Sequence, residues 1–538
     1  MAPQSGRRGL YFACVAGKAP PPNSEGPLRT SFTDSAGAWR AALWVTVALT
    51  AVRLAAIFIT PLELYPDEAQ YWLWSRTLDF GYFSKPPMVA WTIWATTALG
   101  GDSEPFVRLA APLYQAATAL AVFVIASRLY GPMAGLAACA LYHLMPGVQL
   151  SAAVAATDAP LMAFLAWALA LYVFGLSTEG LRRRAAAAGA GALLGLAFLS
   201  KYAALYALIG LVLHLILQPE ARRRWDWRDG ALALAALALV ISPNLIWNAT
   251  HGFATVQHTA ANANWSGQSL FNPEELLDFI GSQFGVFGPV AFGVLLFGSG
   301  LLAVRRRLTE ADITLLCFAA PPLLIVAGQA LISRANANWA AAGYVAGIIL
   351  AAAWLVRWKA RGWFIAAAAS QGLVAGLFLA FVISPDLADR MGFANSFKRA
   401  KGWSQMTQAI TDRAMHDLSL SAIAVDDRFL FNAAAYYGRD YFARADAAPL
   451  RMWVRTATPQ NQAEIAAPLR AEEGGRVLAV SLEPDYAPEM RADFTHSGQD
   501  EVVNVRLDSQ RSRRAEIFTG EAYVRRPRDP VTGLPTRP

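Results

Sequence analysis

The dominant feature of this sequence is a series of apolar stretches of about 20 residues, which recur from Leu43 to Ile383. Such a stretch, folded as a helix, can cross the hydrocarbon core of a bilayer, which is about 30 Å thick. Hydrophobic residues make up 55% of the 538-residue chain and charged residues only 16%, whereas about a quarter of the residues in a soluble domain are charged. The sequence therefore predicts a polytopic α-helical membrane protein and excludes a disordered one.

The apolar pattern stops after Ser384, so we expect residues 385–538 to form a small water-soluble C-terminal domain. It contains 21 basic and 21 acidic residues, so the net charge of +7 belongs entirely to residues 1–384. Its short apolar and alternating segments are typical of an α/β module. All three cysteines lie before this domain, which therefore cannot contain an internal disulfide. The expected strands lie at 421–425, 476–481 and 501–506, and the expected helix lies at 429–437.

Basic residues between the apolar stretches indicate how the helices are oriented, because cytoplasmic loops carry an excess of Lys and Arg. If residues 1–40 are a flexible cytoplasmic tail, every Arg cluster falls on the cytoplasmic side of residues 41–384. The same layout places the loop 61–106, the long loop 248–277 and the C-terminal domain on the outer side of the membrane. The basic clusters then act as topology signals, which excludes nucleic acid as a partner and leaves the lipid bilayer. We expect 11 to 13 crossings, of which 11 are assigned: 41–60, 107–129, 132–150, 159–177, 186–200, 203–218, 230–247, 278–303, 312–332, 339–356 and 363–384.

The first of these loops concentrates the residues suited to chemistry. Residues 65–72 read Tyr-Pro-Asp-Glu-Ala-Gln-Tyr-Trp, and residues 79–87 read Asp-Phe-Gly-Tyr-Phe-Ser-Lys-Pro-Pro. Adjacent carboxylates beside a membrane, at Asp67 and Glu68, are costly unless they are solvated or used in function. The Lys85 ammonium suits a phosphate oxygen. A structural interpretation is equally open at this point, with Asp67 capping a helix and Lys85 reaching lipid headgroups.

These two segments resemble the first periplasmic loop of bacterial polyprenyl-phosphate-sugar glycosyltransferases of the GT-C superfamily, which includes protein O-mannosyltransferases and lipid A aminoarabinose transferases. The resemblance covers residues 40–384 and is most specific across 65–130. It implies that the chain lies in the inner membrane of a bacterial cell, with both outer loops and the C-terminal domain in the periplasm. The segments from Asn244 to His258 and from Asn336 to Trp339 also look like members of this group. One departure is that the aminoarabinose transferases have arginine where this chain has Gln70.

The resemblance implies roles for individual residues. It makes Asp67, Glu68 and Asp158 catalytic. The same three carboxylates offer the hard oxygen ligands that a divalent cation would use, but nothing in the sequence requires such an ion. No other cofactor is implied. The residues expected at the donor phosphate are Lys85, Arg108, Arg334 and Lys201. Those expected at the rest of the substrate are Tyr71, Tyr82, His258, Asn338 and Trp339.

Several of these side chains also have an ordinary structural explanation. Asp158 precedes Ala-Pro, which makes it a good helix start. Lys201 could reach lipid headgroups, His258 could be a plain loop histidine, and Trp339 suits an interfacial aromatic belt.

The implied reaction moves a sugar from a polyprenyl-phosphate donor to an envelope acceptor. Negative charge grows on the departing lipid phosphate, where Lys85 would stabilise it, and Asp67 would take the proton of an attacking hydroxyl. We expect the acceptor to be lipopolysaccharide, lipid A or another glycolipid, with a protein serine or threonine as the alternative. A transporter or flippase of a lipid-linked sugar is the competitor from another class. A membrane anchor whose C-terminal domain binds a ligand is a second one.

Overall fold

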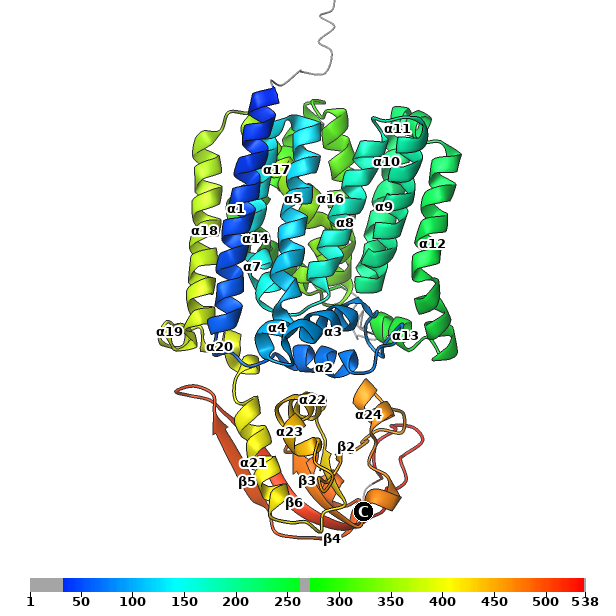
Figure 1. Ribbon diagram of the computed structural model, residues 1–538, viewed down its shortest axis with the longest axis vertical. Coiled ribbons are helices and arrows are strands. Elements are labelled where there is room, and N and C mark those ends of the chain that lie inside the picture. The colour runs from blue at the N-terminus through cyan, green and yellow to red at the C-terminus, as the bar shows by residue number, and fades with distance from the viewer. Residues whose placement is uncertain (1–31, 262–270, 537–538) are drawn as a thin grey trace, which may run out of the picture.

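The computed structural model describes residues 32–261 and 271–536, which form a bundle of long helices with a sheet-containing domain at one end (Figure 1). The flexible tail expected at 1–40 lies outside these residues as far as position 31. The bundle consists of α1 (Phe32–Ile59), α5 (Ala110–Tyr130), α6 (Pro132–Leu144), α7 (Pro146–Ala153), α8 (Asp158–Gly175), α9 (Gly180–Ser200), α10 (Leu205–Leu217), α12 (Trp227–Thr250), α14 (Pro273–Phe287), α15 (Pro289–Val304), α16 (Glu310–Ile332), α17 (Tyr344–Arg357) and α18 (Arg361–Ile383).

Seven helices of the described part are long and apolar enough to cross a membrane, and there are up to nine if each of two bent pairs counts as one span. The sequence predicted 11 to 13. The segment expected at 132–150 bends by 59° between α6 and α7, and that at 278–303 bends by 117° between α14 and α15. Each second helix begins with a proline, which cannot continue the hydrogen-bond ladder of the first. The remaining difference lies in α9, which starts with an arginine cluster, and in α10, which has 13 residues; both run within the bundle in Figure 1.

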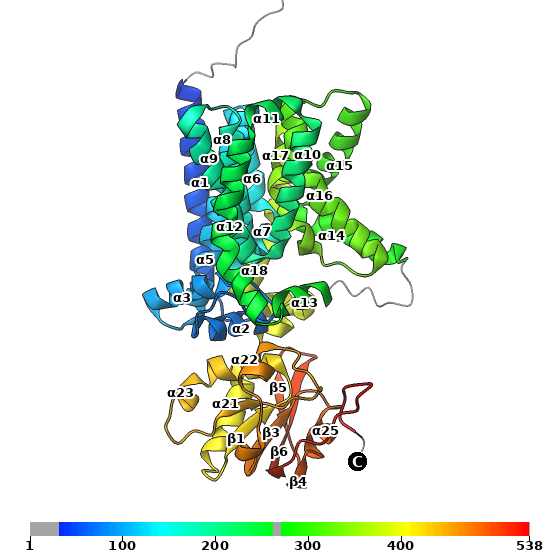
Figure 2. The ribbon, with the colours of Figure 1, turned by 90° about the vertical axis from the view of Figure 1, so that its right-hand side faces the viewer.

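The loop expected at 61–106 forms no crossing. It folds into three short helices that lie between the bundle and the C-terminal domain in both views (Figures 1 and 2). The long loop expected at 248–277 contains one short helix and residues 262–270, which are outside the described part. The short helices of the bundle are α2 (Pro66–Ser75), α3 (Met88–Gly100), α4 (Glu104–Arg108), α11 (Pro219–Arg224), α13 (Ala254–Ala261), α19 (Pro385–Arg390) and α20 (Ala394–Phe397), with the 3-10 helices η1 (Tyr202–Ala204), η2 (Ala337–Gly343) and η3 (Lys398–Ala400).

The C-terminal domain contains a six-stranded mixed sheet with strand order β2-β1-β3-β6-β4, and β5 also pairs with β6. The pairs β1–β2 and β1–β3 are parallel, with Ala424 opposite Ala479, and β6 is antiparallel to its neighbours. The elements expected from the sequence at 421–425, 429–437, 476–481 and 501–506 are all present. The strands are β1 (Ala422–Val425), β2 (Leu450–Met452), β3 (Arg476–Ser481), β4 (Phe494–Ser497), β5 (Glu501–Arg506) and β6 (Ser512–Tyr523).

Alternate residues of the central strands serve two apolar layers. Ile423 and Val425 face the layer formed with α21 (Trp403–Met415) and α22 (Arg428–Tyr437), whereas Ala422 and Ala424 face the layer that contains Trp453. The domain is therefore an α/β module, as the sequence predicts. Its remaining helices are α23 (Arg439–Phe442), α24 (Gln462–Ala466), η4 (Ala471–Glu473) and α25 (Ala487–Arg491).

Specific polar contacts hold this domain against the bundle. The Glu63 carboxylate accepts hydrogen bonds from the backbone N–H groups of Trp403 and Ser404, at the start of α21. The Tyr437 hydroxyl of α22 accepts a 2.7 Å hydrogen bond from Leu64 N and donates one of 2.5 Å to Glu104. The domain is thereby fixed over the same loop that carries the predicted site residues.

Candidate active site

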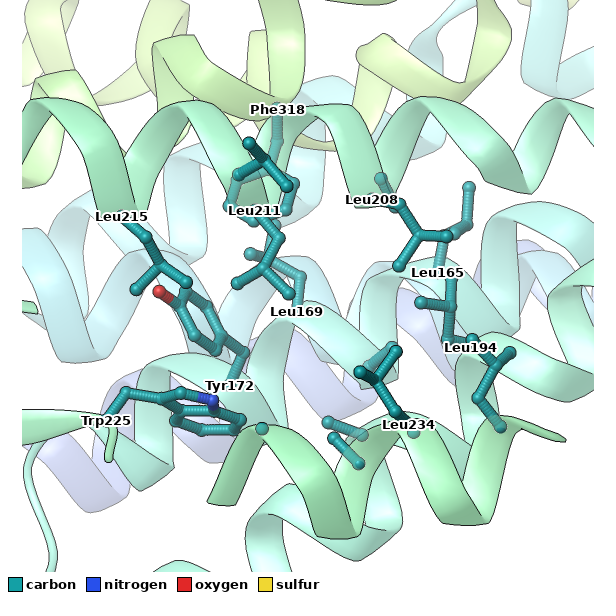
Figure 3. Close-up of a pocket in the computed structure, with 18 of the residues that line it drawn as sticks. Leu165, Leu169, Tyr172, Leu194, Leu208, Leu211, Leu215, Trp225, Leu234 and Phe318 are labelled. Atoms are coloured by element: carbon teal, nitrogen blue, oxygen red, sulfur yellow. The ribbon is translucent and has the colours of Figure 1, made fainter. Parts of the chain in front are cut away.

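Two cavities in the helical part differ in chemistry. One, of about 510 Å³, lies among α8, α9, α10, α12 and α16, and leucine side chains surround Tyr172 and Trp225 there (Figure 3). Arg222 and Asp226 are the charged residues that the described part contributes to its wall. The other cavity, of about 890 Å³, lies where the loop helices meet the bundle, and it is lined by Asp67, Glu68, Tyr71, Lys85, Arg108, Asp158, Lys201, Asn338 and Trp339. This polar cavity brings together nine of the twelve predicted site residues.

Asp67 is the carboxylate that remains available in the polar cavity. Helix α2 starts at Pro66 and is preceded by Tyr65, so Asp67 is its second residue and does not cap it, contrary to the structural alternative. Glu68 fulfils that function by accepting a 2.8 Å hydrogen bond from Tyr65 N. Within the described residues Asp67 has no hydrogen bond or ion pair, and it is half-buried at the cavity wall. Such a carboxylate is free to accept a proton or a substrate hydrogen bond.

Glu68 and Arg108 neutralise each other. Arg108 Nη2 lies 2.8 Å from Glu68 Oε2, and the two side chains are only 3% and 1% exposed. Glu68 Oε1 also accepts a hydrogen bond from Ala155 N, while Arg108 donates to the carbonyl oxygens of Leu62 and Glu63. This buried pair links α2, at the residue next to Asp67 in the sequence, with the segment 62–63 and with Ala155. Its geometry is that of a support for the site, although the sequence suggested catalysis for Glu68 and phosphate binding for Arg108.

Asp158 belongs to a second charged group in the wall of the polar cavity. Helix α8 starts at Asp158, but its carboxylate does not cap the helix: Oδ1 lies 2.8 Å from Lys201 Nζ, and Oδ2 accepts a 3.0 Å hydrogen bond from Asn338. The three residues come from α8, from the end of α9 and from η2, which are far apart in the sequence. The structure thus joins three predicted site residues, and it uses the Lys201 charge for an internal ion pair.

Lys85 lines the cavity, and its ammonium group makes no hydrogen bond or ion pair with any described residue. Burial and the neighbouring Lys201 lower its pKa, while Asp67 and Asp158 act in the opposite direction. His258 on α13 stands edge-on to Phe83, with ring centroids 5.7 Å apart. Burial, followed by the positive charge of Lys85, lowers the pKa of His258 to about 4. His258 is therefore neutral at physiological pH, so it cannot serve as a second cation.

Three predicted residues, Tyr82, His258 and Arg334, are not among the residues that line the polar cavity. The buried Tyr82 ring stacks on Trp74, and its hydroxyl donates to backbone carbonyl groups of the same loop. Arg334 is exposed and does not belong to the cavity wall. Tyr71 does line the wall, and burial and the neighbouring Asp67 raise the pKa of its hydroxyl, which keeps its proton. Tyr71 therefore belongs to the cavity wall, whereas Tyr82 and Arg334 do not.

The predicted carboxylates do not fit a shared divalent cation. Both oxygens of Glu68 are taken by Arg108 and by backbone N–H groups, and those of Asp158 are taken by Lys201 and Asn338. No group of three acidic, histidine or cysteine side chains in the described part could hold a metal ion. Asp67 alone is left of the set that the sequence suggested.

One side of the polar cavity is apolar and extends into the bundle. It is formed by α7 and α18 and by the connection to the C-terminal domain. Sequence reasoning missed this wall, because its residues belong to helices that are apolar all round and give no periodic signal. The members are Leu150, Val154, Val374, Leu377, Phe378, Phe381, Phe393 and Phe397.

The helical bundle has, at one end, the polar cavity with its apolar wall, and the α/β domain covers that end. This arrangement is typical of a membrane enzyme that acts on an amphipathic substrate. The chain belongs to the GT-C superfamily of membrane glycosyltransferases, as the sequence motifs indicated. Residues 84–247 match the family described as dolichyl-phosphate-mannose-protein mannosyltransferase.

The chain is also similar to one curated protein in sequence and to one solved structure in fold. It is 40% identical over 321 residues to lipid A galacturonosyltransferase RgtD of Rhizobium johnstonii, a match that covers 60% of this chain and 66% of that protein. Its fold is similar to that of ArnT from Cupriavidus metallidurans in the apo state, with a TM-score of 0.61 and 17% identity, over 91% of this chain and 99% of ArnT. The ArnT structure bound to undecaprenyl phosphate matches with the same TM-score and 18% identity, over 88% of this chain and 97% of that one.

Proposed function

We propose that the chain transfers a sugar from a polyprenyl-phosphate donor to a lipid A-type glycolipid on the periplasmic face of a bacterial inner membrane. The observation that carries this proposal is one cavity holding an unpaired carboxylate, Asp67, and an unpaired ammonium, Lys85, beside an apolar wall. The name of the relative RgtD supports a lipid A acceptor and, more finely, a galacturonosyl donor. The name of the ArnT complex supports an undecaprenyl carrier.

The cavity suits the two halves of such a donor. An isoprenoid chain can lie along the Phe378 and Phe381 wall, where burial of apolar surface favours binding by about 25 cal/mol per Å². The phosphate then meets Lys85, whose charge is otherwise uncompensated. Burial and then the Lys201 charge lower the pKa of Lys85, and the negative charge of the donor's phosphodiester would act in the opposite direction.

Transfer then consists of one substitution at the anomeric carbon. A hydroxyl oxygen of the acceptor forms the new bond to that carbon, and the bond to the lipid-phosphate oxygen breaks with its electron pair. Asp67 takes the proton of the hydroxyl, and Lys85 stabilises the charge that develops on the phosphate. Glu68 and Arg108 hold the start of α2 in place, so that Asp67 is aimed into the cavity.

The orientation in the membrane is supported by the distribution of charge. The connections that carry the Arg clusters lie at the end of the bundle remote from the C-terminal domain, where α11 is seen in Figure 1. Contacts among them, such as Arg183 with Asp226 and Arg357 with Asp312, join these connections at that end. Because Arg-rich loops stay in the cytoplasm, the polar cavity and the C-terminal domain belong to the periplasmic side.

The decisive experiment compares two adjacent carboxylates. Asp67→Asn should reduce sugar transfer by roughly 10²–10⁴-fold, as expected for loss of a general base, and leave thermal stability unchanged. Glu68→Gln should instead lower stability by about 3–5 kcal/mol, because it leaves the buried Arg108 charge uncompensated. Transfer is measured with purified protein in micelles, polyprenyl-phosphate galacturonate as donor, and lipid A or a serine-containing peptide as acceptor.

Asp79→Asn is the matched control, since Asp79 lies on the same loop, caps only the adjacent Phe80 N and does not line the cavity. Unchanged transfer by the Asp67 variant would remove Asp67 from the mechanism. Transfer to peptide and not to lipid A would replace the glycolipid acceptor by a protein. Movement of the donor across vesicle membranes without any sugar transfer would favour the flippase alternative.

A further inference from the structure

Arg428 is a cation that neither the loop motifs nor the fold requires. It is the first residue of α22, directly after the carboxyl end of β1 and the turn residues Asp426 and Asp427. Its guanidinium lies over the Phe429 ring at 4.7 Å, and it makes no hydrogen bond or ion pair with any residue in the described ranges. An unpaired, half-buried arginine is costly unless a ligand uses it.

The two aspartates that precede Arg428 are hydrogen-bonded to other groups. Asp427 caps α22 by accepting hydrogen bonds of 2.9 Å from both Phe429 N and Leu430 N. Asp426 contacts the Ser481 hydroxyl and accepts a 3.0 Å hydrogen bond from Leu482 N, across the sheet. Neither carboxylate forms an ion pair with Arg428 in the described part, although the Arg428 charge acts against the burial that raises the pKa of the adjacent Asp427.

Helix α22 is held against the site loop, which fixes where Arg428 can act. Trp72 of α2 meets Tyr436 of α22 edge-on, with ring centroids 4.9 Å apart, and the Tyr436 hydroxyl donates a 2.6 Å hydrogen bond to Asp102 O. Figures 1 and 2 both show α22 at the top of the C-terminal domain, next to α2. Arg428 lies close enough to Tyr71, Lys85 and His258 for its charge to act on all three. Two of these side chains line the polar cavity.

Not every positive charge near the polar cavity is balanced by a negative side chain. Arg108 is paired with Glu68 and Lys201 with Asp158, so of these four cations Lys85 and Arg428 are left without an ion pair among the described residues. A donor phosphate satisfies only Lys85. A planar guanidinium with forked donors matches either a carboxylate or a phosphate, and the donor phosphate is already assigned to Lys85. Because Arg428 and Lys85 share neighbours, the second anion belongs close to the donor phosphate, on the sugar itself.

We propose that Arg428, supplied by the C-terminal domain, binds the carboxylate of an acidic sugar on the donor and so selects a hexuronate over a neutral hexose. This proposal rests on the proposed function, which supplies the donor phosphate at Lys85. It gives the C-terminal domain a direct part in donor recognition. In a hexuronate the carboxylate carbon is C6. It lies on the other side of the ring oxygen from C1, whose oxygen carries the phosphate.

The test uses two donors that differ at this carbon alone, polyprenyl-phosphate galacturonate and polyprenyl-phosphate galactose, with the full-length protein in micelles. Arg428→Gln should raise the KM for the galacturonate donor at least tenfold and leave the KM for the galactose donor within twofold. Arg428→Lys should recover part of the loss. Arg444→Gln is the control, because Arg444 is an exposed arginine of the same domain that pairs with Asp446 away from the cavity.

Two outcomes would overturn the assignment. An equal effect of Arg428→Gln on both donors would mean a structural role. An effect that disappears when lipid A is replaced by its dephosphorylated form would mean that Arg428 reads a phosphate of the acceptor. Absence of transfer by the unmodified protein would instead contradict the proposed function. In that case the thermal stabilisation given by each donor still decides whether Arg428→Gln selectively loses the galacturonate.

Discussion

Asp67 and Glu68 are adjacent carboxylates with different surroundings. Successive residues of an α-helix point about 100° apart, so Glu68 turns into the protein toward Arg108 while Asp67 faces the cavity. Their pattern in the sequence predicted that the loop is functional. It could not predict which of the two is free, because the partner of Glu68 lies 40 positions further along the chain.

A single acidic residue should make the stability of the C-terminal domain depend on pH. Burial raises the pKa of Asp426 to about 7. The Ser481 hydroxyl has one hydrogen and contacts both Asp426 and Glu483 O, an arrangement that is fully satisfied when Asp426 carries a proton. The folded state thus binds this proton more tightly than the unfolded state, whose aspartate has a pKa near 3.9.

Stability should therefore fall as the pH rises from about 4 to about 7, by an amount on the order of 4 kcal/mol for this shift, and then remain constant. Asp426→Asn mimics the protonated form, so it should remove this dependence and raise stability at pH 8, with little effect at pH 4. Thermal unfolding of the full chain as a function of pH measures both effects. An identical pH profile in the variant would show that Asp426 titrates normally.

Helices α9 and α12 approach each other closely through glycine. A Cβ atom added at Gly191 would lie 2.0 Å from Ala233 O, and one added at Gly195 would lie 2.7 Å from Val240 Cβ. The spacing of four residues places both glycines on one face of α9, which is how small residues let helices pack in membranes. The apolar part of α9 is barely long enough to cross a membrane, and this contact with α12 holds α9 in the bundle.

Gly191→Val should separate α9 from α12 and destabilise the bundle by about 1–3 kcal/mol, the usual cost of overpacking. The control is Gly300→Val on α15, where an added Cβ meets nothing within 4 Å. Unfolding in micelles, followed by thermal shift, compares the two. Equal stability of both variants would show that α9 and α12 do not need close contact.

The breaks within the bundle illustrate a signal that the apolar pattern conceals. Hydropathy gives one stretch at 278–303, yet Gly288 has φ +109° and is followed by Pro289, so the chain turns between α14 and α15. A glycine followed by a proline is a known breaker in any sequence. Length and hydropathy therefore predicted where apolar segments lie, but these local residues decide how many of them are continuous helices.

Both ends of the helical bundle carry polar residues, but the residue types at the two ends differ. Arg clusters lie at one end, and the carboxylates, Lys85 and the C-terminal domain lie at the other (Figure 1). A net charge of +7 held in the helical part alone, beside a neutral C-terminal domain, is the property of the sequence that predicts this arrangement.

Cysteine labelling tests the orientation directly. In a variant whose three native cysteines are replaced by serine, Leu418→Cys should react with a membrane-impermeant maleimide in cells with a permeable outer membrane, because Leu418 is 77% exposed in the C-terminal domain. Arg223→Cys, at a side chain 81% exposed at the opposite end, should react only after the inner membrane is opened. The reverse pattern would put the polar cavity on the cytosolic side and contradict the proposed function.

The sequence by itself determined the class of fold, the place where the membrane part ends, the main strands of the C-terminal domain and the loop that carries Asp67 and Lys85. These follow from local properties: hydrophobic length, alternation and short motifs. The tertiary structure alone decided which charges cancel, since Glu68 with Arg108 and Asp158 with Lys201 are pairs between distant segments. It also placed Arg428, from a domain without a recognisable motif, where its charge acts on Tyr71 and Lys85, because electrostatic neighbours are set by packing and not by order along the chain.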